Sequence, residues 1–391
     1  MTVLLDLTIL STSDTARGVG RYAIDLAHGL AGLGSVEPEV VAVTELPWIG
    51  LPARATDLNE AVARCIDGGG PVRSYWDWQW RLRLRLGAAC RAAGAGLVHT
   101  VHAGATPLVD VGCPRVTTCL DLIPLIFPKH YAGWKSGFHA GRRRLDWRRY
   151  HGADHVIAIS RATADDLMRL LEVPASKITV VHLSVDHDRF RPDPLPSDRS
   201  ALTRLGLHDT PYVLSVGALE WRKNVPGTID AFARARRRVP ELKFVWAGRW
   251  PEQGRAEIEA LCDRLGVRDA VVLTGFVSED ELAALYRGAQ MLLFLSRYEG
   301  FGNPPIEAMA SGCPVITGRN SSLLEVAEDA AIAVDTEDYA AAADAIVALQ
   351  DETERRRLKA AGLERARHFS NARMAAETLD VYRDVQRSAR R

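Results

Sequence analysis

Between residues 291 and 317 the sequence predicts a strand, a glycine-rich loop, a helix and a second strand, in that order. The apolar run Met291–Leu295 is typical of a buried strand. Pro304 and Pro305 favour the start of the helix, because the N–H groups of a first turn have no helical partner. The second strand is expected at Pro314–Thr317. The same strand–helix order recurs along the 391 residues, so the chain is predicted to be an α/β protein.

The loop and the start of this helix together have the features of an anion site. Glu299 lies in the loop and Glu307 in the expected first turn of the helix, with seven residues between them. The N–H groups and the dipole of a helix N-terminus both attract a phosphate group. Carboxylates at the same place are natural partners for sugar and ribose hydroxyls. The alternative interpretation is a helix N-terminus that carries two solvated acids.

The motif Glu299–Glu307, E-G-F-G-N-P-P-I-E, is followed by A-M-A-S-G-C-P-V, a serine pair and a glutamate. This pattern resembles the donor-site signature of the retaining glycosyltransferases of family 4, the glycosyl transferases group 1. Leu324 departs from the pattern, since many relatives carry proline before the last glutamate. The resemblance implies an α/β protein with the GT-B fold, in which two Rossmann-like domains with parallel sheets face a central cleft.

A change of composition marks the boundary between the two expected domains. Residues 190–200 contain three prolines and two aspartates, which is typical of a linker. We expect an N-terminal, acceptor-side Rossmann-like domain at residues 1–192 and a C-terminal, nucleotide-sugar donor domain at residues 193–370. In this fold the last helix, here residues 371–391, is expected to cross back to the N-terminal domain. A hydrophobic content of 47% is sufficient for two cores.

A second motif adds positive charge to the expected donor site. The predicted strand Tyr212–Val216 is followed by G-A-L-E-W-R-K-N, in which Arg222 and Lys223 lie at a junction between a loop and a helix. Arginine offers a bidentate fork to a diphosphate and lysine a point charge. The motif resembles the G-x-x-x-x-R-K-N of the family, whose Arg and Lys bind the donor diphosphate. The alternative is an exposed basic pair.

The resemblance implies a role for each of these side chains. Arg222, Lys223 and Glu299 are the expected catalytic residues, the two cations stabilising the charge of the leaving diphosphate. Glu299 would position the donor sugar and Glu307 would hold the ribose hydroxyls. No metal ion or other cofactor is then required. Further donor contacts are expected from the loop and backbone positions Gly18, Gly20, Val277, Gly300, Phe301 and Gly302.

The segment R-G-V-G-R-Y follows the first predicted strand, Val3–Leu10, and precedes a helix expected to begin near Tyr22. Gly18 and Gly20 allow a ligand to approach the backbone closely. They also fit the dinucleotide fingerprint G-x-G-x-x-A, but they lie eight residues beyond the strand end, where that fingerprint requires a tight turn. Family members carry a similar loop that faces the cleft, so Arg21 is a candidate for the acceptor side.

Three further residues are acceptor-side candidates. His99 and His102 lie at the end of a predicted strand, and the carboxyl ends of parallel strands face the ligand crevice. Asp121 lies in C-L-D-L-I-P, which resembles the H-D-L-x-P of the family, although Leu120 replaces the histidine of many relatives. Either histidine is a spatial substitute for the missing one, or both are packed or surface residues.

Other patterns argue against a metal and against nucleic acid. The sequence Asp186-His-Asp188 has the D-x-D form of a metal motif, but it matches a linker of the family. The six cysteines show no metal-like spacing and are expected to be reduced thiols of a cytoplasmic protein. Lys plus Arg and Asp plus Glu number 49 each, so no bias toward nucleic acid exists.

The segment Arg73–Arg91 combines four aromatic residues with arginines that alternate with leucines. One interpretation is an interfacial element that contacts an anionic membrane or a lipid-linked acceptor, at the inner face of the membrane. The other, which we prefer, is a helix whose aromatic side chains pack into the domain while the arginines extend to solvent. No run of about 18 apolar residues, the length of a membrane span, occurs in the sequence.

The resemblance implies transfer of a hexosyl group from a nucleotide-diphosphate sugar, with a GDP or UDP base, to a glycan, a lipid-linked or a small-molecule acceptor. Mannose is the expected sugar, because the G-V-G-R-Y and W-R-K-N segments resemble bacterial mannosyltransferases of polysaccharide biosynthesis. The alternatives are a sugar-nucleotide epimerase or a glycoside synthase of the same fold. A non-catalytic nucleotide-sugar binding protein is the alternative of a different class.

Overall fold

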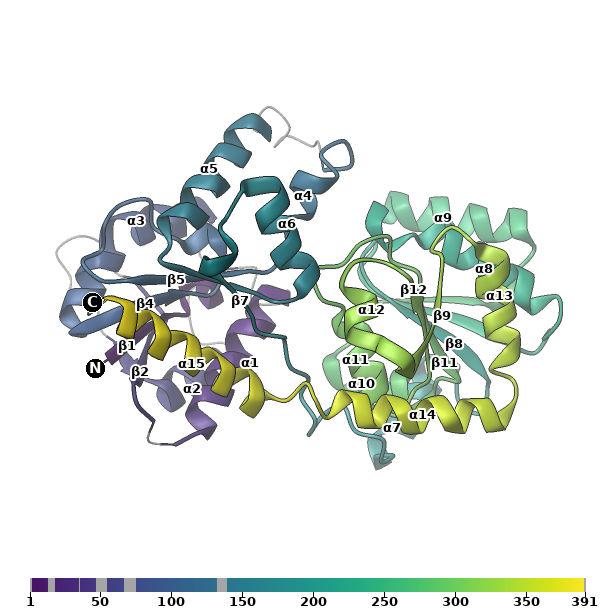
Figure 1. The fold of residues 1–391 in the computed structure, drawn as a ribbon. Coiled ribbons are helices and arrows are strands. Elements are labelled where there is room, and N and C mark those ends of the chain that lie inside the picture. The colour runs from purple at the N-terminus through teal and green to yellow at the C-terminus, as the bar shows by residue number, and fades with distance from the viewer. Residues whose placement is uncertain are drawn as a thin grey trace. The chain divides into compact units, whose positions relative to one another are not determined.

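The chain forms two compact units in the computed structural model, which describes residues 2–12, 18–34, 36–46, 55–66, 75–131 and 139–389. The first unit comprises Met1–Ser184 and Ser370–Arg391, and the second comprises Val185–Phe369. The chain therefore enters the second unit once and returns to the first for its last helix (Figure 1). The sequence predicts these two boundaries at residues 192 and 370.

The first unit is built on a seven-stranded sheet in the order β3-β2-β1-β4-β5-β6-β7. Its strands are parallel except for the short edge strand β3, which pairs antiparallel with β2. The order with β1 inside and β4 beside it is that of a Rossmann sheet. The strands are β1 Thr2–Asp6, β2 Glu39–Val43, β3 Thr56–Asp57, β4 Ala95–Thr100, β5 Arg115–Cys119, β6 His155–Ala158 and β7 Ile178–Val180.

Helices connect these strands and cover the sheet (Figure 1). The C-terminal helix α15 lies along α1, and Gly29 of α1 permits the close approach, since a Cβ there would collide with the carbonyl of Asn371. This contact attaches the end of the chain to its beginning. The helices are α1 Gly18–Gly32, α2 Leu58–Ile66, α3 Tyr75–Ala92, α4 Ile123–Ile126, α5 His139–Gly152, α6 Arg161–Leu171 and α15 Asn371–Ala389.

The second unit repeats the arrangement with a six-stranded parallel sheet in the order β10-β9-β8-β11-β12-β13. Its strands are β8 Tyr212–Val216, β9 Lys243–Ala247, β10 Val271–Gly275, β11 Met291–Phe294, β12 Val315–Gly318 and β13 Ala331–Val334. Its helices are α7 Pro196–Arg204, α8 Val225–Arg236, α9 Glu252–Leu265, α10 Glu279–Gly288, α11 Asn303–Ala310, α12 Ser321–Ala327, α13 Tyr339–Ala348 and α14 Glu352–Ala366.

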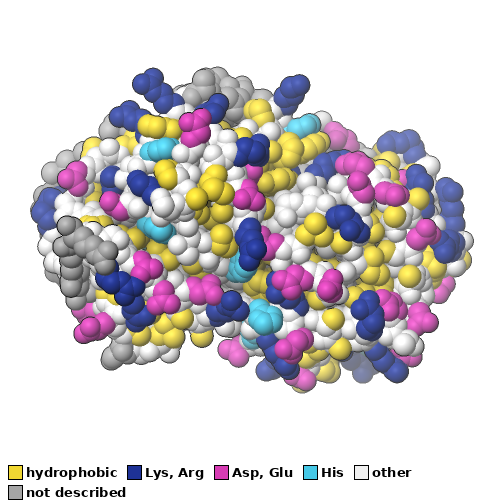
Figure 2. All heavy atoms as spheres, in the orientation of Figure 1, with side chains coloured by type: hydrophobic (Ala, Val, Ile, Leu, Met, Phe, Trp, Pro, Cys, Tyr) yellow, Lys and Arg dark blue, Asp and Glu magenta, His cyan; other side chains and the backbone are white. Residues whose placement is uncertain are grey.

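The strands of the second unit are mostly apolar because helices cover both faces of the sheet. Phe232, Phe244 and Trp246 contact one another in sequence in this core, with the two phenylalanine ring centroids 5.2 Å apart. On the outside, basic and acidic side chains are interspersed over the visible face of this unit (Figure 2). This agrees with the balanced charge of the sequence.

Two parallel sheets with covering helices confirm the predicted α/β class, but the first strand is shorter than expected. It ends at Asp6, and a 3-10 helix follows at Thr8–Ser11. The Asp6 carboxylate accepts hydrogen bonds from the N–H and hydroxyl of Thr8, at 3.0 and 2.7 Å, and so turns the chain out of the strand. Gly18 and Gly20 belong to the first turn of α1 and not to a preceding loop.

The segment Arg73–Arg91, for which a packed helix was preferred over an interfacial element, corresponds largely to helix α3. All four of its aromatic side chains, and Arg17 of the R-G-V-G-R-Y segment, lie outside what the structure describes. Within the described ranges, every helix is too short or too polar to cross a membrane.

Candidate active site

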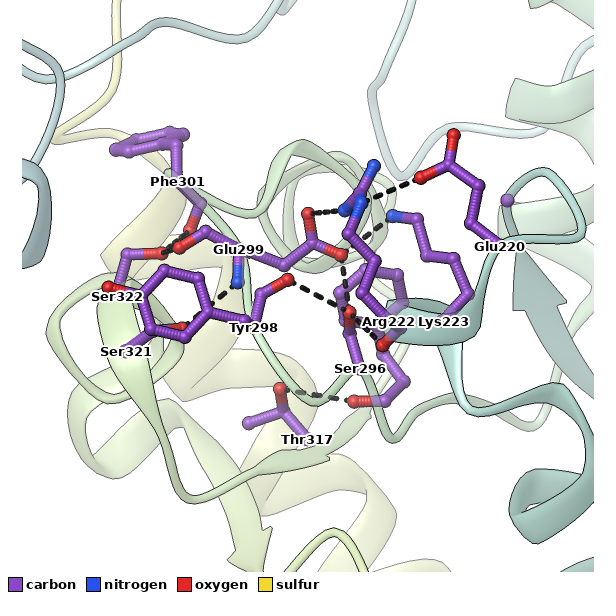
Figure 3. Close-up of polar contacts among 12 residues, drawn as sticks. Glu220, Arg222, Lys223, Ser296, Tyr298, Glu299, Phe301, Thr317, Ser321 and Ser322 are labelled. Atoms are coloured by element: carbon purple, nitrogen blue, oxygen red, sulfur yellow. Dashed lines mark hydrogen bonds and ion pairs between the residues drawn. The ribbon is translucent and has the colours of Figure 1, made fainter. Parts of the chain in front are cut away.

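The carboxyl ends of β8 and β11 carry the charged residues of the candidate site. These two strands are neighbours in the sheet, so the loops that follow them lie side by side. The loop after β8 contains Arg222 and Lys223, and the loop after β11 contains Glu299. The three side chains point toward one another (Figure 3). The structure therefore brings together three residues that the sequence separates by more than seventy positions.

Both cations contact the carboxylate of Glu299. Lys223 Nζ donates a hydrogen bond to Oε1 at 2.7 Å, and Arg222 Nη1 donates to Oε2. Ser296 Oγ lies 2.6 Å from the same Oε1 and donates to it. On its other side, Arg222 Nε donates to the exposed carboxylate of Glu220 at 2.8 Å. The side chains of Lys223 and Glu299 are only 10% and 9% exposed, so each needs the other as a counter-charge.

Burial and charge act in opposite directions on the pKa of Glu299. Burial alone would raise it, but the positive charges of Lys223 and Arg222 together outweigh burial and hold the pKa below its usual value. Burial lowers the pKa of Lys223, against the attraction of Glu299. The Glu299 carboxylate is therefore ionised at neutral pH, and it lies between the side chains of Arg222 and Lys223.

The backbone that carries the cations is held by the loop after β11. Arg222 lies in the 3-10 helix η6, Trp221–Lys223. Its carbonyl oxygen accepts from the Arg297 N–H at 2.7 Å and lies 2.9 Å from Ser296 Oγ. The Arg297 guanidinium also lies over the Trp221 ring at 5.1 Å and donates to Glu337 at 2.6 Å. These contacts fix the position from which the two cations extend.

The predicted serine pair holds the glycine loop. Ser322 Oγ lies within hydrogen-bond distance of the carbonyl oxygens of Glu299 and Phe301, at 2.9 and 2.7 Å, and Ser321 Oγ accepts from the Glu299 N–H at 3.1 Å. Gly302 has a φ of +116°, and a Cβ there would meet Leu323. The loop needs glycine at 302 for both reasons.

The second predicted glutamate lies apart from this cluster. Helix α11 begins at Asn303, so Glu307 lies beyond its first turn, contrary to the prediction, because the helix starts two residues earlier than Pro305. The side chain is 4% exposed, and Tyr286 OH donates to its Oε2 at 3.0 Å. Tyr286 comes from α10 and is a partner that the sequence did not indicate.

An aromatic side chain that the sequence analysis missed follows β10. Phe276 is 66% exposed, although it is a large apolar residue, and the Arg249 guanidinium lies 4.7 Å from its ring. Arg249 follows β9 and Phe276 follows β10. Both therefore lie at the carboxyl ends of the parallel strands, as the charged cluster does. Val277, a predicted donor contact, is the next residue and is partly exposed. A solitary exposed phenylalanine has no periodic signature in the sequence.

The structure does not support the predicted acceptor-side role of His99. Its side chain is fully buried, with Nδ1 2.6 Å from Tyr382 OH of α15 and Nε2 2.8 Å from Thr118 Oγ1. Burial lowers the pKa of His99 to about 3, so the ring is neutral at pH 7. Both ring nitrogens have partners inside the first unit, which makes His99 a packed core histidine.

The remaining predicted residues of the first unit have local roles or exposed positions. His102 caps the 3-10 helix at Ala103–Ala105 by accepting from the Gly104 N–H, and Asp121 is exposed and accepts from the Ile123 N–H at 3.0 Å. Arg21 is half-buried. Gly18 is exposed and Gly20 buried. The structure does not test their contacts with a ligand.

The D-x-D segment forms a turn. Asp186 Oδ1 accepts from the N–H groups of Asp188 and Arg189, at 3.0 and 3.2 Å. In the described part of the chain, no three His, Cys, Asp or Glu side chains are grouped as a metal ion would require.

Two family models match the chain. Glycosyltransferase Family 4 matches residues 16–189, and Glycosyl transferases group 1 matches residues 203–365. The chain thus contains both a family 4 and a group 1 glycosyltransferase domain. The first model covers most of the first unit and the second covers the strands β8 to β13 with the charged cluster. The resemblance inferred from the sequence motifs is confirmed.

Curated relatives in the family include a serotype-specific mannosyltransferase WbdA of Escherichia coli, 29% identical over 73% of this chain and 35% of the relative. A D-inositol 3-phosphate glycosyltransferase of Xylanimonas cellulosilytica is 36% identical over 59% of this chain and 57% of the relative. The matched region thus spans about a third of the length of the first relative and just over half of the length of the second.

Solved structures confirm the GT-B fold. Sucrose-phosphate synthase from Thermosynechococcus elongatus superposes with a TM-score of 0.74 at 22% identity, over 99% of this chain and 100% of that one. HepE of Anabaena in complex with UDP-glucose superposes with a TM-score of 0.72 at 18% identity, over 98% and 100% of the two chains. At such identities the likeness concerns the fold alone.

Proposed function

We propose that this glycosyltransferase-family chain transfers a hexosyl group from a nucleotide-diphosphate sugar to an acceptor hydroxyl, with retention of the anomeric configuration. The observation that carries the proposal is the buried cluster of Arg222, Lys223 and Glu299 at the carboxyl end of the second sheet. A buried lysine and arginine beside a glycine loop are suited to a diphosphate, because that group offers several charged oxygens to both cations.

The two cations would stabilise the transition state. As the anomeric bond breaks, negative charge develops on the leaving diphosphate, and Arg222 and Lys223 are held in advance at one side of the site. Helix α11 adds the positive end of its dipole and the N–H of Asn303, since Pro304 and Pro305 have no N–H to offer. In this proposal the two cations supply the charge neutralisation for which other transferases use a metal ion.

The two glutamates would bind hydroxyl groups. Glu299 would hold the donor sugar and steady positive charge at the anomeric carbon, and Glu307 would hold the ribose. Glu299 is not proposed as a covalent nucleophile, because its carboxylate faces the cations that bind the leaving group. Retention would instead follow from attack on the face that the diphosphate leaves, with the diphosphate accepting the acceptor's proton.

We propose mannose as the transferred sugar and a GDP base as its carrier. Support comes from two relatives by name, the serotype-specific mannosyltransferase WbdA and the O-antigen chain mannosyltransferase B of Escherichia coli, the second 30% identical over 58% of this chain. A UDP-sugar is the alternative, since the HepE structure contains UDP-glucose. A polysaccharide or lipid-linked glycan would then be the acceptor, and a small molecule the alternative.

Acceptor contacts are proposed for the first unit. Arg21, His102 and Asp121 keep this role, along with Gly18 and Gly20 near the donor phosphates. A cytoplasmic location, with contact to a lipid-linked acceptor at the membrane surface, is likewise proposed from the sequence. None of these assignments requires nucleic acid.

Incubation of the purified protein with GDP-mannose and UDP-glucose, with and without a panel of mannosyl and lipid-linked acceptors, tests the proposal. We expect acceptor-dependent release of the nucleoside diphosphate and, by NMR, a product with the donor's anomeric configuration. An inverted product would contradict retention. Conversion of the nucleotide sugar in the absence of acceptor would instead identify an epimerase.

A further inference from the structure

Protein carboxylates already balance the positive charge of the two cations in the candidate site. Two positive side chains, Arg222 and Lys223, face two negative ones, Glu220 and Glu299, so the cluster has no net charge (Figure 3). The Glu299 carboxylate contacts Lys223 through one oxygen and Arg222 through the other. A diphosphate that approaches this cluster must compete with the carboxylate for both cations.

We propose that Glu299 is an internal counter-ion that the donor diphosphate displaces from Arg222 and Lys223, and that the displaced carboxylate then binds the donor sugar. The inference rests on the proposed function. It gives Glu299 a second task, which is to select the intact donor over the nucleoside diphosphate product. An intact donor offers sugar hydroxyls to the displaced carboxylate, whereas the product leaves that carboxylate buried and unpaired.

The contacts around Glu299 allow this exchange with movement of side chains alone. The Glu299 backbone is bonded to Ser321 and Ser322, and the η6 turn is bonded to the loop after β11 and braced by Arg297. Neither backbone segment needs to move for the Glu299 carboxylate to turn away from the cations.

Ser296 has the geometry of a group that takes part in the exchange. Its single hydroxyl proton has three acceptors within reach: Glu299 Oε1 at 2.6 Å, the Arg222 carbonyl at 2.9 Å and the Tyr298 carbonyl at 3.3 Å. One hydroxyl can donate to only one of them at a time. When the carboxylate leaves, the proton can be donated to the Arg222 carbonyl, which keeps the turn in place.

Glu220 provides a matched control within the same cluster. It accepts a hydrogen bond from the same guanidinium, but its side chain is 41% exposed, against 9% for Glu299. Water screens an exposed ion pair, so Glu220 competes weakly with a ligand. Glu220→Gln and Glu299→Gln each remove one negative charge next to the same guanidinium, that of Arg222.

The test measures the affinity of GDP, UDP and inorganic pyrophosphate by calorimetry for the full-length wild type, Glu299→Gln and Glu220→Gln. We expect Glu299→Gln to bind the nucleoside diphosphate at least tenfold more tightly than the wild type, and Glu220→Gln to differ by less than threefold. Ligand-free Glu299→Gln should melt at a lower temperature than the wild type, because two cations lose a buried counter-ion, and the nucleotide should raise its Tm by more.

An unchanged or weaker affinity of folded Glu299→Gln would overturn the inference, even if the wild type transfers sugar. Absence of nucleotide binding by every protein would overturn the proposed function and the inference with it. If Glu299→Gln does not fold, Glu299→Asp replaces it: its shorter carboxylate cannot contact both cations, so the expected affinity for the nucleoside diphosphate rises severalfold, and no rise contradicts the inference.

Discussion

Each unit buries a polar cluster, and the two clusters differ in charge. In the first unit, His99 is neutral and bonds to the hydroxyls of Tyr382 and Thr118. In the second, the ionised carboxylate of Glu299 lies between two cations. Uncharged groups that satisfy one another gain little from a ligand, whereas buried ions can exchange a partner for a ligand of the same charge. The charge of the partners, more than burial, thus separates a candidate site from a packed core.

Removal of a cation should have the largest effect on transfer. Lys223→Ala is expected to lower kcat/KM more than tenfold, a loss of at least about 1.4 kcal/mol of transition-state stabilisation, because one charge on the leaving diphosphate loses its partner. Steady-state transfer assays measure this. Arg238→Ala is the control, since Arg238 is exposed and pairs with the exposed Asp344. Wild-type rates in Lys223→Ala would remove the second unit's cluster from the mechanism.

Loss of the Glu307 carboxylate should reduce transfer more than loss of the Tyr286 hydroxyl that contacts it. Glu307→Ala is expected to lower kcat/KM more than tenfold, because the ribose hydroxyls lose their acceptor. Tyr286→Phe removes only the hydroxyl that donates to Glu307 and should have a smaller effect. Equal losses in the two variants would instead indicate that Glu307 acts by packing α10 against α11.

The polar core of the first unit should affect stability and not chemistry. His99→Leu leaves the hydroxyls of Tyr382 and Thr118 without their histidine partner, so the free energy of unfolding should fall by about 1–3 kcal/mol. The kcat and KM of the folded variant should match the wild type. Denaturant titration and transfer assays measure the two effects. A loss of transfer at unchanged stability would return His99 to the acceptor site.

The same histidine predicts a dependence of stability on pH. Burial lowers the pKa of His99 from 6.5 to about 3. Between these values the unfolded chain binds a proton that the folded chain does not, so the contribution of His99 is complete above pH 6.5 and is lost as the pH falls toward 3. The stability advantage of the wild type over His99→Leu should therefore shrink between pH 7 and pH 4. A constant difference would mean that the folded protein protonates His99 normally.

The smallest effect on donor binding is expected for removal of the exposed Phe276 ring, which follows β10. We expect a nucleotide base to lie near Val277, against Phe276, and Phe276→Ala to weaken donor binding severalfold, by about 1 kcal/mol. Calorimetry with GDP and UDP measures the change. Phe276→Tyr keeps the ring and is the control. Equal binding by Phe276→Ala and Phe276→Tyr would leave base recognition to the backbone of Val277.

Much of the fold could be predicted from the sequence where elements are short, apolar and bounded by turn residues. Tyr212–Val216 was predicted with the bounds that the structure has, and the strand predicted at Met291–Leu295 differs from β11 by one residue. The first strand was predicted too long, because the bonds from Thr8 to Asp6 that end it leave no mark on the apolar pattern.

Parts of the site were predictable only through the resemblance. Nothing local in the sequence brings Glu299 to Lys223, which lie 76 residues apart. The bracing contact between Arg297 and Glu337 was missed, since charged residues in loops have no periodicity. For a related reason the sequence could not decide between the two interpretations of His99: its partner Tyr382 lies 283 residues later, on a helix that returns from the second unit.

Thermal unfolding of the wild type and Lys223→Ala with a panel of nucleoside diphosphates tests the central claim, a donor site built on the second unit's cations. A ligand at 100 times its Kd stabilises a protein by about 2.7 kcal/mol. We predict that one diphosphate, GDP first, raises the Tm of the wild type and fails to do so for Lys223→Ala. No shift with any nucleotide, or the same shift in both proteins, would contradict this account.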